Sequence, residues 1–217
     1  GRDISYRAFD QRIRRVAGFL RHDLDVEQGD RVAFLGLNSP DMLALMFAFA
    51  RNGAILVPLN SRLSPPEHLY ILKNAGVKVL FCEDEFAEGA ETIDTGLDDC
   101  RVVAMGDEFE QFVAAAPPDA VDPAVGPEDP LLIVYTSGTT GRPKGAVLTQ
   151  NAMIFNAVNS IAMHDMTSND VIFTNLPMFH VGGLNIQTTP ALHAGAMVIM
   201  HRRFDPDATV DVIRDEK

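Results

Sequence analysis

The sequence contains few cysteines and no long apolar run, and each absence excludes a class of protein. Only two of its 217 residues are cysteines, Cys82 and Cys100, and neither belongs to a CxxC pair. No His/Cys cluster has the spacing of a zinc site, so we expect two reduced thiols rather than a disulfide or a metal. The longest apolar stretch, Met42 to Ala50, is about half as long as a transmembrane helix must be. We therefore expect no transmembrane segment.

Targeting and nucleic-acid signals are also missing from the sequence. The N-terminus does not combine a basic stretch with an apolar core, as a signal peptide does. No basic stripe with interleaved aromatic residues is present, which argues against a nucleic-acid partner. These observations predict a cytoplasmic protein whose partners are small molecules.

The negative charge of the chain is concentrated in one stretch. The formal net charge is −12, and residues 83–130 hold 15 acidic residues and a single base, Arg101. The remainder of the chain is close to neutral. We interpret the acidic stretch as a solvated surface with loops. Apolar residues make up 47% and charged residues 22% of the chain, which is enough to form a hydrophobic core without disulfides.

Helical and strand patterns alternate in the first half of the chain. Helical spacing of apolar residues, with Ser or Ser-Pro at the expected start, occurs at 5–24, 39–52 and 64–76. Short buried-strand patterns occur between them, at 31–36, 54–59 and 77–82. This alternation predicts an α/β fold in which a mainly parallel β-sheet is flanked by helices.

The second half continues the alternation after an irregular stretch. Residues 117–130 contain five prolines and three aspartates without a clear period, and we interpret them as a linker. The linker would separate a first α/β unit, 1–116, from a second, 131–217. Strands are predicted at 101–105, 131–136, 146–149, 171–176 and 197–200. Helices are predicted at 107–116, 151–163, 183–194 and from Asp205 to the end.

The strongest chemical motif is the stretch Tyr135–Gly145, YTSGTTGRPKG, which follows a predicted strand. Its glycines let backbone N–H groups approach an anion, and its hydroxyls add further hydrogen-bond donors for phosphate oxygens. Lys144 supplies a compact positive charge. It is not a Walker A loop, because Pro143 precedes Lys144, Gly145 follows it, and the next predicted element is a strand. The alternative interpretation is a glycine-rich hairpin without a ligand.

This motif resembles the phosphate loop of the adenylate-forming superfamily of acyl-CoA synthetases, luciferases and peptide-synthetase adenylation domains. The stretches at 29–59 and at 176–183 (LPMFHVGG) resemble other blocks of that family, so the likeness covers essentially the whole chain. The resemblance implies part of the large N-terminal domain, with ATP, Mg²⁺ and coenzyme A as ligands. It implies that Thr136 also contacts Mg²⁺ and that the ATP phosphates are bound by Thr136, Ser137, Gly138, Thr139, Thr140, Gly141 and Lys144.

The residue after Phe179 indicates a branch of the family. An amino-acid-activating enzyme usually has an aspartate here, to pair with the substrate's ammonium group, and this chain has His180. The resemblance therefore implies a simple carboxylic acid, and we expect a medium- or long-chain fatty acid. His180 and Lys144 are the candidate catalytic residues. The acyl pocket would be shaped by His180, Val181, Gly182, Gly183 and Leu184.

The same resemblance implies family elements that this sequence does not contain. They are the segment with the Mg²⁺-binding glutamate, the ribose-binding aspartate, and the C-terminal domain with its adenylation lysine. We therefore expect an N-terminal fragment that is inactive alone and that self-associates, as a homodimer, through surface meant for the missing part. Two alternatives stay open: an acyl-adenylate ligase that loads a carrier protein, and a non-catalytic nucleotide-binding module.

Overall fold

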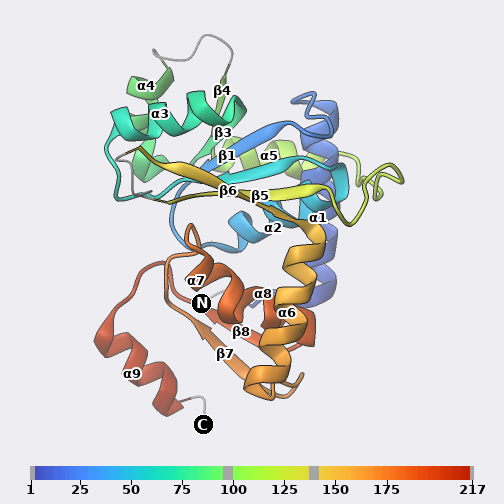
Figure 1. Cartoon of the computed structure of the whole chain (residues 1–217), viewed down its shortest axis with the longest axis vertical. Coiled ribbons are helices and arrows are strands. Elements are labelled where there is room, and N and C mark those ends of the chain that lie inside the picture. Colours follow the sequence, from blue (N-terminus) through green and yellow to red (C-terminus); the bar gives the residue numbers. More distant parts are fainter. Residues whose placement is uncertain (1–2, 95–99, 137–141, 216–217) are drawn as a thin grey trace. The chain divides into compact units, whose positions relative to one another are not determined.

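The computed structural model describes residues 3–94, 100–136 and 142–215, and the chain divides into two compact units (Figure 1). Unit 1 comprises Gly1–Gly36 and Asp41–Gln150, and unit 2 comprises Leu37–Pro40 and Asn151–Lys217. The short segment Leu37–Pro40 thus belongs with the C-terminal part of the chain. The division falls after Gln150, whereas the sequence analysis expected it within 117–130.

Unit 1 is built on a six-stranded sheet with the strand order β4-β3-β1-β2-β5-β6. All neighbouring strands are parallel except β5 and β6, which form an antiparallel pair. The prediction of a mainly parallel sheet is therefore confirmed. The strands are β1 (Arg31–Leu35), β2 (Ile55–Pro58), β3 (Val77–Cys82), β4 (Arg101–Ala104), β5 (Pro130–Thr136) and β6 (Lys144–Thr149).

Two helices of this unit begin directly after the capping residues that the sequence indicates, Ser5 and Ser64. Ser5 caps the first helix by accepting a hydrogen bond from the N–H of Ala8 at 3.2 Å. The N–H of Ser64 donates to the carboxylate of Glu67 at 2.8 Å, one half of a capping box. Two short elements, η1 and α4, were not predicted. The helical elements are α1 (Tyr6–His22), α2 (Pro40–Asn52), α3 (Pro65–Ala75), η1 (Asp84–Phe86), α4 (Ala87–Asp94) and α5 (Asp107–Ala115).

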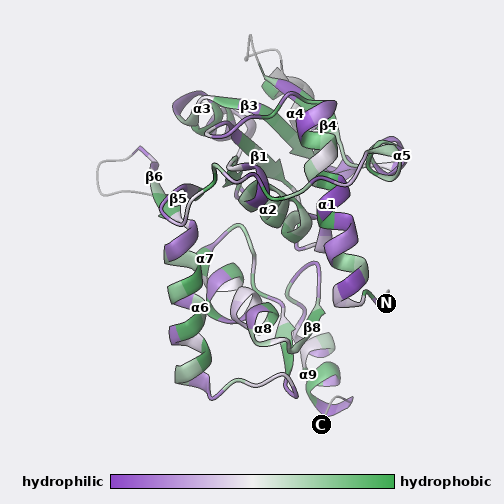
Figure 2. Ribbon diagram, turned by 90° about the vertical axis from the view of Figure 1, so that its right-hand side faces the viewer, coloured by the Kyte–Doolittle hydropathy of each residue, from purple (hydrophilic) through white to green (hydrophobic). Residues whose placement is uncertain are grey.

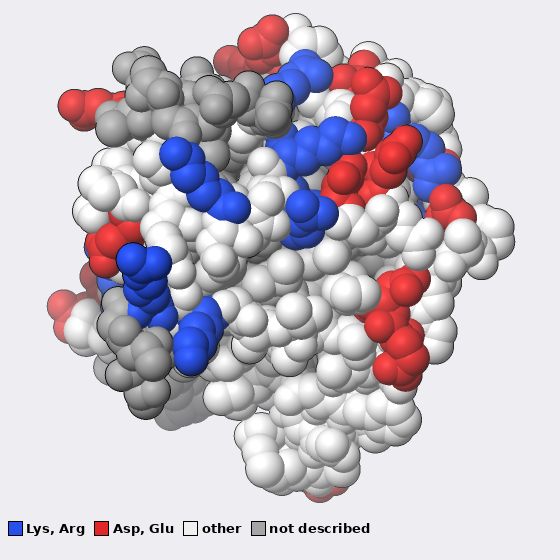
Figure 3. All heavy atoms as spheres, turned by 45° about the horizontal axis from the view of Figure 1, so that its top comes forward, with Lys and Arg blue, Asp and Glu red and all other residues white. Residues whose placement is uncertain are grey.

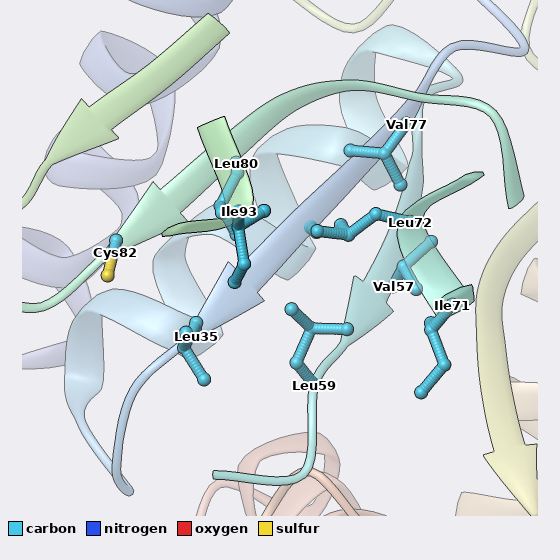
Figure 4. Packing of buried hydrophobic residues seen from close by; sticks show 10 residues of the cluster. Leu35, Val57, Leu59, Ile71, Leu72, Val77, Leu80, Cys82 and Ile93 are labelled. Atoms are coloured by element: carbon cyan, nitrogen blue, oxygen red, sulfur yellow. The ribbon is translucent and has the colours of Figure 1, made fainter. Parts of the chain in front are cut away.

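Helices cover both faces of the sheet. Alternate strand residues point to opposite sides, so apolar side chains on both faces are buried under helices. On one face, Leu35 and Leu80 pack with Leu72 of α3 and Ile93 of α4 (Figure 4). On the other face, the ring of Phe81 meets that of Phe109 on α5, which in turn contacts Phe19 of α1. The central strands are mainly hydrophobic along their length (Figure 2). A strand buried on both sides needs such a sequence.

The expected linker, 117–130, packs against α1 within unit 1. The backbone N–H of Asp119 donates to the carbonyl of Arg14 at 2.9 Å, and the Asp119 carboxylate lies 2.8 Å from the Arg21 guanidinium. A methyl group at Gly18 would lie 1.8 Å from the carbonyl oxygen of Pro117. The chain and α1 therefore touch backbone to backbone. This contact explains why the stretch is part of a compact unit despite its prolines.

Several acids of the stretch 83–130 are paired with bases from α1. Arg12 contacts Glu110 at 2.6 Å, and Arg21 contacts Asp122 at 3.1 Å. Acidic and basic side chains accordingly occur side by side on the face shown in Figure 3. Such partly exposed pairs contribute little stability, on the order of 0–1 kcal/mol each. They reduce the local excess of negative charge, which agrees with the interpretation of a solvated surface.

Unit 2 contains a parallel pair of strands joined by three consecutive helical segments. Strand β7 (Val171–Thr174) pairs in register with β8 (Met197–Met200). The connection, predicted as one helix over 183–194, consists of α7 (Val181–Gly183), a π-helical turn η2 (Leu184–Thr188) and α8 (Thr189–Ala194). Helix α6 (Gln150–His164) precedes β7, and α9 (Pro206–Asp215) follows β8. A small core of Met166, Ala191 and Ala196 packs against residues of α6, β7, α8 and β8.

None of the helices formed by the described residues is long and apolar enough to cross a membrane. The longest, α1, has 17 residues and is amphipathic. It buries Val16 and Leu20 but exposes Arg14 and Arg15, as a helix at the surface of a folded domain does.

Candidate functional site

The antiparallel hairpin of β5 and β6 brings Thr136 and Lys144 together. The two residues are register partners, and the pair before them is Tyr135 with Gly145. Both Thr136 and Lys144 are exposed, so a residue with a hydroxyl and a residue with an ammonium group are neighbours where the two strands meet the connecting loop. The predicted phosphate-binding residues Ser137, Gly138, Thr139, Thr140 and Gly141 lie outside the described residues.

Two side chains of α3 contact the hairpin next to its connecting loop. The hydroxyl of Tyr135 donates a hydrogen bond to Oδ1 of Asn74 at 2.6 Å. The hydroxyl of Tyr70 lies 3.4 Å from the carbonyl oxygen of Pro143. Burial, reinforced by the nearby Tyr70, raises the pKa of Tyr135 above its ordinary value of 10.0, so its hydroxyl remains a donor at neutral pH. Sequence reasoning missed Tyr70 and Asn74, whose only signal is their spacing of one helical turn.

Gly145 is crowded by the side chains of Ile133 and Tyr135 on the neighbouring strand. A methyl group at Gly145 would lie 2.5 Å from Cγ2 of Ile133 and 3.2 Å from Cζ of Tyr135. The tyrosine ring therefore lies across the strand over the backbone of its partner. Gly145, the last residue of YTSGTTGRPKG, thus has a packing role that is independent of any ligand.

His180 begins the short helix α7 in unit 2. Its Nδ1 accepts a hydrogen bond from the N–H of Gly182 at 3.0 Å. Because Nδ1 is the acceptor, a neutral ring carries its proton on Nε2. The side chain is exposed, so it presents an N–H donor to solvent. This geometry suits a residue that donates a hydrogen bond to an anionic or carbonyl oxygen.

The residues after His180 differ in how far they are buried. Gly183 is enclosed, since a methyl group there would lie 2.3 Å from the carbonyl oxygen of Pro177 and 2.6 Å from that of Leu176. Leu184 is 1% exposed, and Val181 and Gly182 are half-buried. Close packing accounts for Gly183 and Leu184 within unit 2. Their predicted role in an acyl pocket stays a prediction.

Asn38 holds the segment that precedes His180. Its Nδ2 donates to the carbonyl of Leu176 at 2.8 Å and to that of His201 at 3.1 Å, and its Oδ1 accepts from the N–H of Met178 at 2.8 Å. The residue is 4% exposed. These three bonds join the ends of β7 and β8 to the turn carrying His180. Sequence reasoning missed Asn38, because its partners are more than 130 residues away.

The candidate residues therefore form two groups. Thr136 and Lys144 meet within unit 1, and His180 to Leu184 are contiguous within unit 2. In the part of the chain that the structure describes, no three His, Cys, Asp or Glu side chains cluster as metal ligands would. Within the described residues, the two groups provide an exposed hydroxyl and ammonium group on the β5–β6 hairpin and an exposed imidazole at the start of α7.

The model of one protein family matches the chain from residue 1 to residue 217, and its description is AMP-binding enzyme. The chain belongs to the AMP-binding enzyme family. The resemblance drawn from the YTSGTTGRPKG and LPMFHVGG motifs is thereby confirmed, as is its assignment to adenylate-forming enzymes.

Curated relatives within the AMP-binding family act on different acids. The chain is 48% identical to an indoleacetate–CoA ligase of Aromatoleum aromaticum and 37% identical to a feruloyl-CoA synthase of an Amycolatopsis species. It is 36% identical to ScoC, a fatty acid–[acyl-carrier-protein] ligase of Streptomyces coeruleorubidus. These alignments include 99–100% of this chain but 42–44% of the relatives. The chain thus spans less than half the length of the relatives it matches.

A solved structure shares the fold of this AMP-binding chain. The ATP-bound crystal structure of MatB from Rhodopseudomonas palustris aligns with a TM-score of 0.88 and 30% identity. The alignment covers 99% of this chain and 43% of MatB. The α/β architecture with its mainly parallel sheet is therefore that of the N-terminal part of an adenylate-forming enzyme.

Proposed function

We propose that the enzyme of which this chain forms a part activates a carboxylic acid with ATP and transfers it to coenzyme A. A carboxylate oxygen attacks the α-phosphorus of ATP, and pyrophosphate leaves, which yields an acyl-adenylate. The sulfur of coenzyme A then attacks the acyl carbon, loses its proton, and releases AMP. In such reactions the protein mainly aligns the reactants and stabilises charge.

The pairing of Thr136 with Lys144 at the loop end of the β5–β6 hairpin is the observation that carries this proposal. An ammonium group there neutralises charge on the phosphates, and its flexible stem lets it follow the departing pyrophosphate. The hydroxyl of Thr136 adds a neutral ligand. The number of hydroxyl and glycine residues in the sequence YTSGTTGRPKG suits a triphosphate rather than a single anion.

Mg²⁺ fits this site only as a companion of ATP. Proteins usually hold Mg²⁺ through one or two side chains together with substrate phosphates and water. The exposed hydroxyl of Thr136 could occupy one position of such an ion. Bound there, Mg²⁺ would neutralise phosphate charge.

We propose a simple acid as the substrate, with an aromatic acid as the first candidate. His180 stands where an amino-acid-activating relative would have an aspartate. The 48% identity to an indoleacetate–CoA ligase and the 37% identity to a feruloyl-CoA synthase support an aromatic acid over the fatty acid that the motifs first suggested. Purified full-length protein tested with indoleacetate, ferulate and decanoate, by acid-dependent ATP–pyrophosphate exchange, ranks these classes. Preference for decanoate would restore the fatty-acid assignment.

Substitution of Lys144 tests the phosphate-binding role. In the full-length protein we expect Lys144→Ala to reduce acid-dependent ATP–pyrophosphate exchange by about 100-fold or more, as the loss of a preorganised charge does. Lys73→Ala on α3 is the matched control, since it removes an exposed lysine from the same unit. Unchanged exchange in the Lys144 variant would refute the assignment and favour a non-catalytic nucleotide-binding module.

A carrier protein is the alternative acceptor. The 36% identity to the carrier-protein ligase ScoC supports this candidate. Incubation of the full-length enzyme with its acid, ATP and either coenzyme A or a phosphopantetheinyl carrier protein separates the two. Mass spectrometry of the thioester identifies the acceptor.

We also infer that residues 1–217 alone do not complete the reaction. The curated relatives are more than twice as long, since the chain spans 42–44% of them. Acid-dependent ATP–pyrophosphate exchange by the purified 217-residue chain, at the rate of the full-length enzyme, would refute this inference.

A further inference from the structure

We propose that Asn74 and Tyr70 of α3 position the phosphate-binding hairpin, with Asn74 as the main anchor. Neither residue belongs to the glycine-rich motif. Each contacts one of the two strand ends that carry Thr136 and Lys144. The proposal deepens the proposed adenylation function and rests on it.

The anchoring geometry follows from the helical period and the strand register. Tyr70 and Asn74 are four residues apart on α3, so they lie on one face of the helix, one turn apart. Tyr135 and Pro143 immediately precede Thr136 and Lys144 on the two sides of the hairpin. Asn74 therefore contacts the β5 side and Tyr70 the β6 side. A helix packed on the sheet in this way fixes both ends of the loop.

The contact to Asn74 is the stronger of the two. The Tyr135–Asn74 distance of 2.6 Å is that of a short, well-formed O–H···O bond. The Tyr70–Pro143 distance of 3.4 Å exceeds the ordinary range for such bonds. Tyr70 also packs against the core cluster under α3, so its ring has a structural role apart from its hydroxyl. Removal of the Asn74–Tyr135 bond should therefore have the larger effect.

Gly145 makes the anchor sterically feasible. The ring of Tyr135 lies over Gly145, within 3.2 Å of the position a methyl group would take. A side chain there would push the ring aside and move its hydroxyl relative to Asn74. The motif glycine and the helix residue outside the motif thus cooperate to place one tyrosine.

The contacts made by Asn74 and Tyr70 should affect the use of ATP and not the binding of the acid or of coenzyme A. Fixing the strand ends reduces the number of positions that Thr136 and Lys144 sample, so more of the binding free energy is available to align the phosphates. The second half-reaction starts from acyl-adenylate, which has no β- or γ-phosphate. Loss of the anchor should therefore weaken adenylation and spare thioester formation.

The test compares three substitutions in the full-length enzyme. Tyr135→Phe removes only the donor hydroxyl, Asn74→Leu removes the acceptor, and Asn74→Asp retains an acceptor oxygen. We expect the first two to lower kcat/KM for ATP in the pyrophosphate exchange by about threefold to tenfold, the effect of one lost hydrogen bond. Asn74→Asp should stay within about twofold of wild type, and Tyr70→Phe should change less than Tyr135→Phe.

Two further measurements separate positioning from general damage. KM for the acid, and the rate of thioester formation from supplied acyl-adenylate and coenzyme A, should remain at wild-type values in the Tyr135→Phe and Asn74→Leu variants. Tyr6→Phe on α1 is the matched tyrosine control. Equal loss in both half-reactions, or wild-type kcat/KM for ATP in both variants, would overturn the proposal. If the wild-type enzyme itself shows no acid-dependent exchange, the proposed function fails instead.

Discussion

Oδ1 of Asn38 accepts a hydrogen bond from the backbone N–H of Met178 across 140 residues of sequence, at 2.8 Å. The same side chain donates to the carbonyl oxygens of Leu176 and His201. Truncation of a buried amide that satisfies three backbone groups leaves those groups unpaired. Asn38 thus fixes the turn that leads to His180.

Replacement of Asn38 should destabilise unit 2 in a graded manner. We expect Asn38→Ala to lower the free energy of unfolding by about 1–3 kcal/mol, because it leaves buried polar groups unpaired. Asn38→Asp should cost more, since it places a carboxylate against the carbonyl oxygens of Leu176 and His201. Urea unfolding followed by circular dichroism measures both effects. The control is Asn159→Ala at an exposed position of α6; equal midpoints for all variants would contradict the prediction.

Gly183→Ala should be poorly tolerated because of backbone rather than side-chain crowding. The new methyl group would lie 2.3 Å from the carbonyl oxygen of Pro177, and that backbone is held in place by Asn38. We expect the free energy of unfolding to fall by about 1–3 kcal/mol, the typical cost of overpacking. Thermal melts of the variant and of wild type measure this loss. At Gly126 a methyl group meets nothing within 4 Å, so Gly126→Ala serves as the control. A Gly183→Ala melt matching wild type would show that the turn can move.

Cys82 should resist alkylation and should make the fold weaker at alkaline pH. Burial, reinforced by the carboxylates of Glu83 and Asp84, raises the pKa of its thiol from 9.0 to about 12. The unfolded chain therefore loses this proton first, and the contribution to stability that is present below about pH 9 declines as the pH rises toward 12. Relative to Cys82→Ala, wild type should lose about 1.4 kcal/mol of unfolding free energy for each pH unit above 9.

Iodoacetamide at pH 8 provides the second measurement for Cys82. Cys100 is partly exposed whereas Cys82 is buried, so mass spectrometry should find Cys100 modified first in the folded chain. Both thiols should react in urea. Early modification of Cys82 in the native protein would contradict the prediction.

Most elements of unit 1, though not η1 and α4, were predictable because local signals agree with the tertiary structure. Ser5 and the Ser64–Glu67 capping box mark helix starts by hydrogen bonds within one turn. Gly76 ends α3 in the left-handed conformation, with φ of 64°, which glycine adopts readily. The division between units was not predictable, because it depends on which distant segments pack together. Pro117 lies against Gly18 of α1, and no feature of 117–130 alone indicates that contact.

The candidate site was predictable only where the motif itself carries the chemistry. Thr136 and Lys144 were singled out from the composition of YTSGTTGRPKG, and the structure adds that they are register partners. Asn38, Tyr70 and Asn74 carry no such signal, since they act on backbone or side chains far away in sequence. Their roles depend on strand order and on helix placement.

Substitutions of His180 can separate its structural role from a chemical role at the candidate site. Its Nδ1 caps α7 through the N–H of Gly182, while its Nε2 faces solvent. His180→Asn retains an oxygen that can accept from Gly182 and lacks the Nε2 donor, whereas His180→Ala removes both. If the donor acts on substrate, both variants of the full-length enzyme should lose about tenfold or more in kcat/KM for the acid, and the Asn variant should melt like wild type. His193→Asn, at an exposed position of α8, is the matched control. Wild-type turnover by His180→Asn would show that the histidine acts as a helix cap and not on the substrate. The Nε2 donor, which that variant lacks, would then have no part in the reaction.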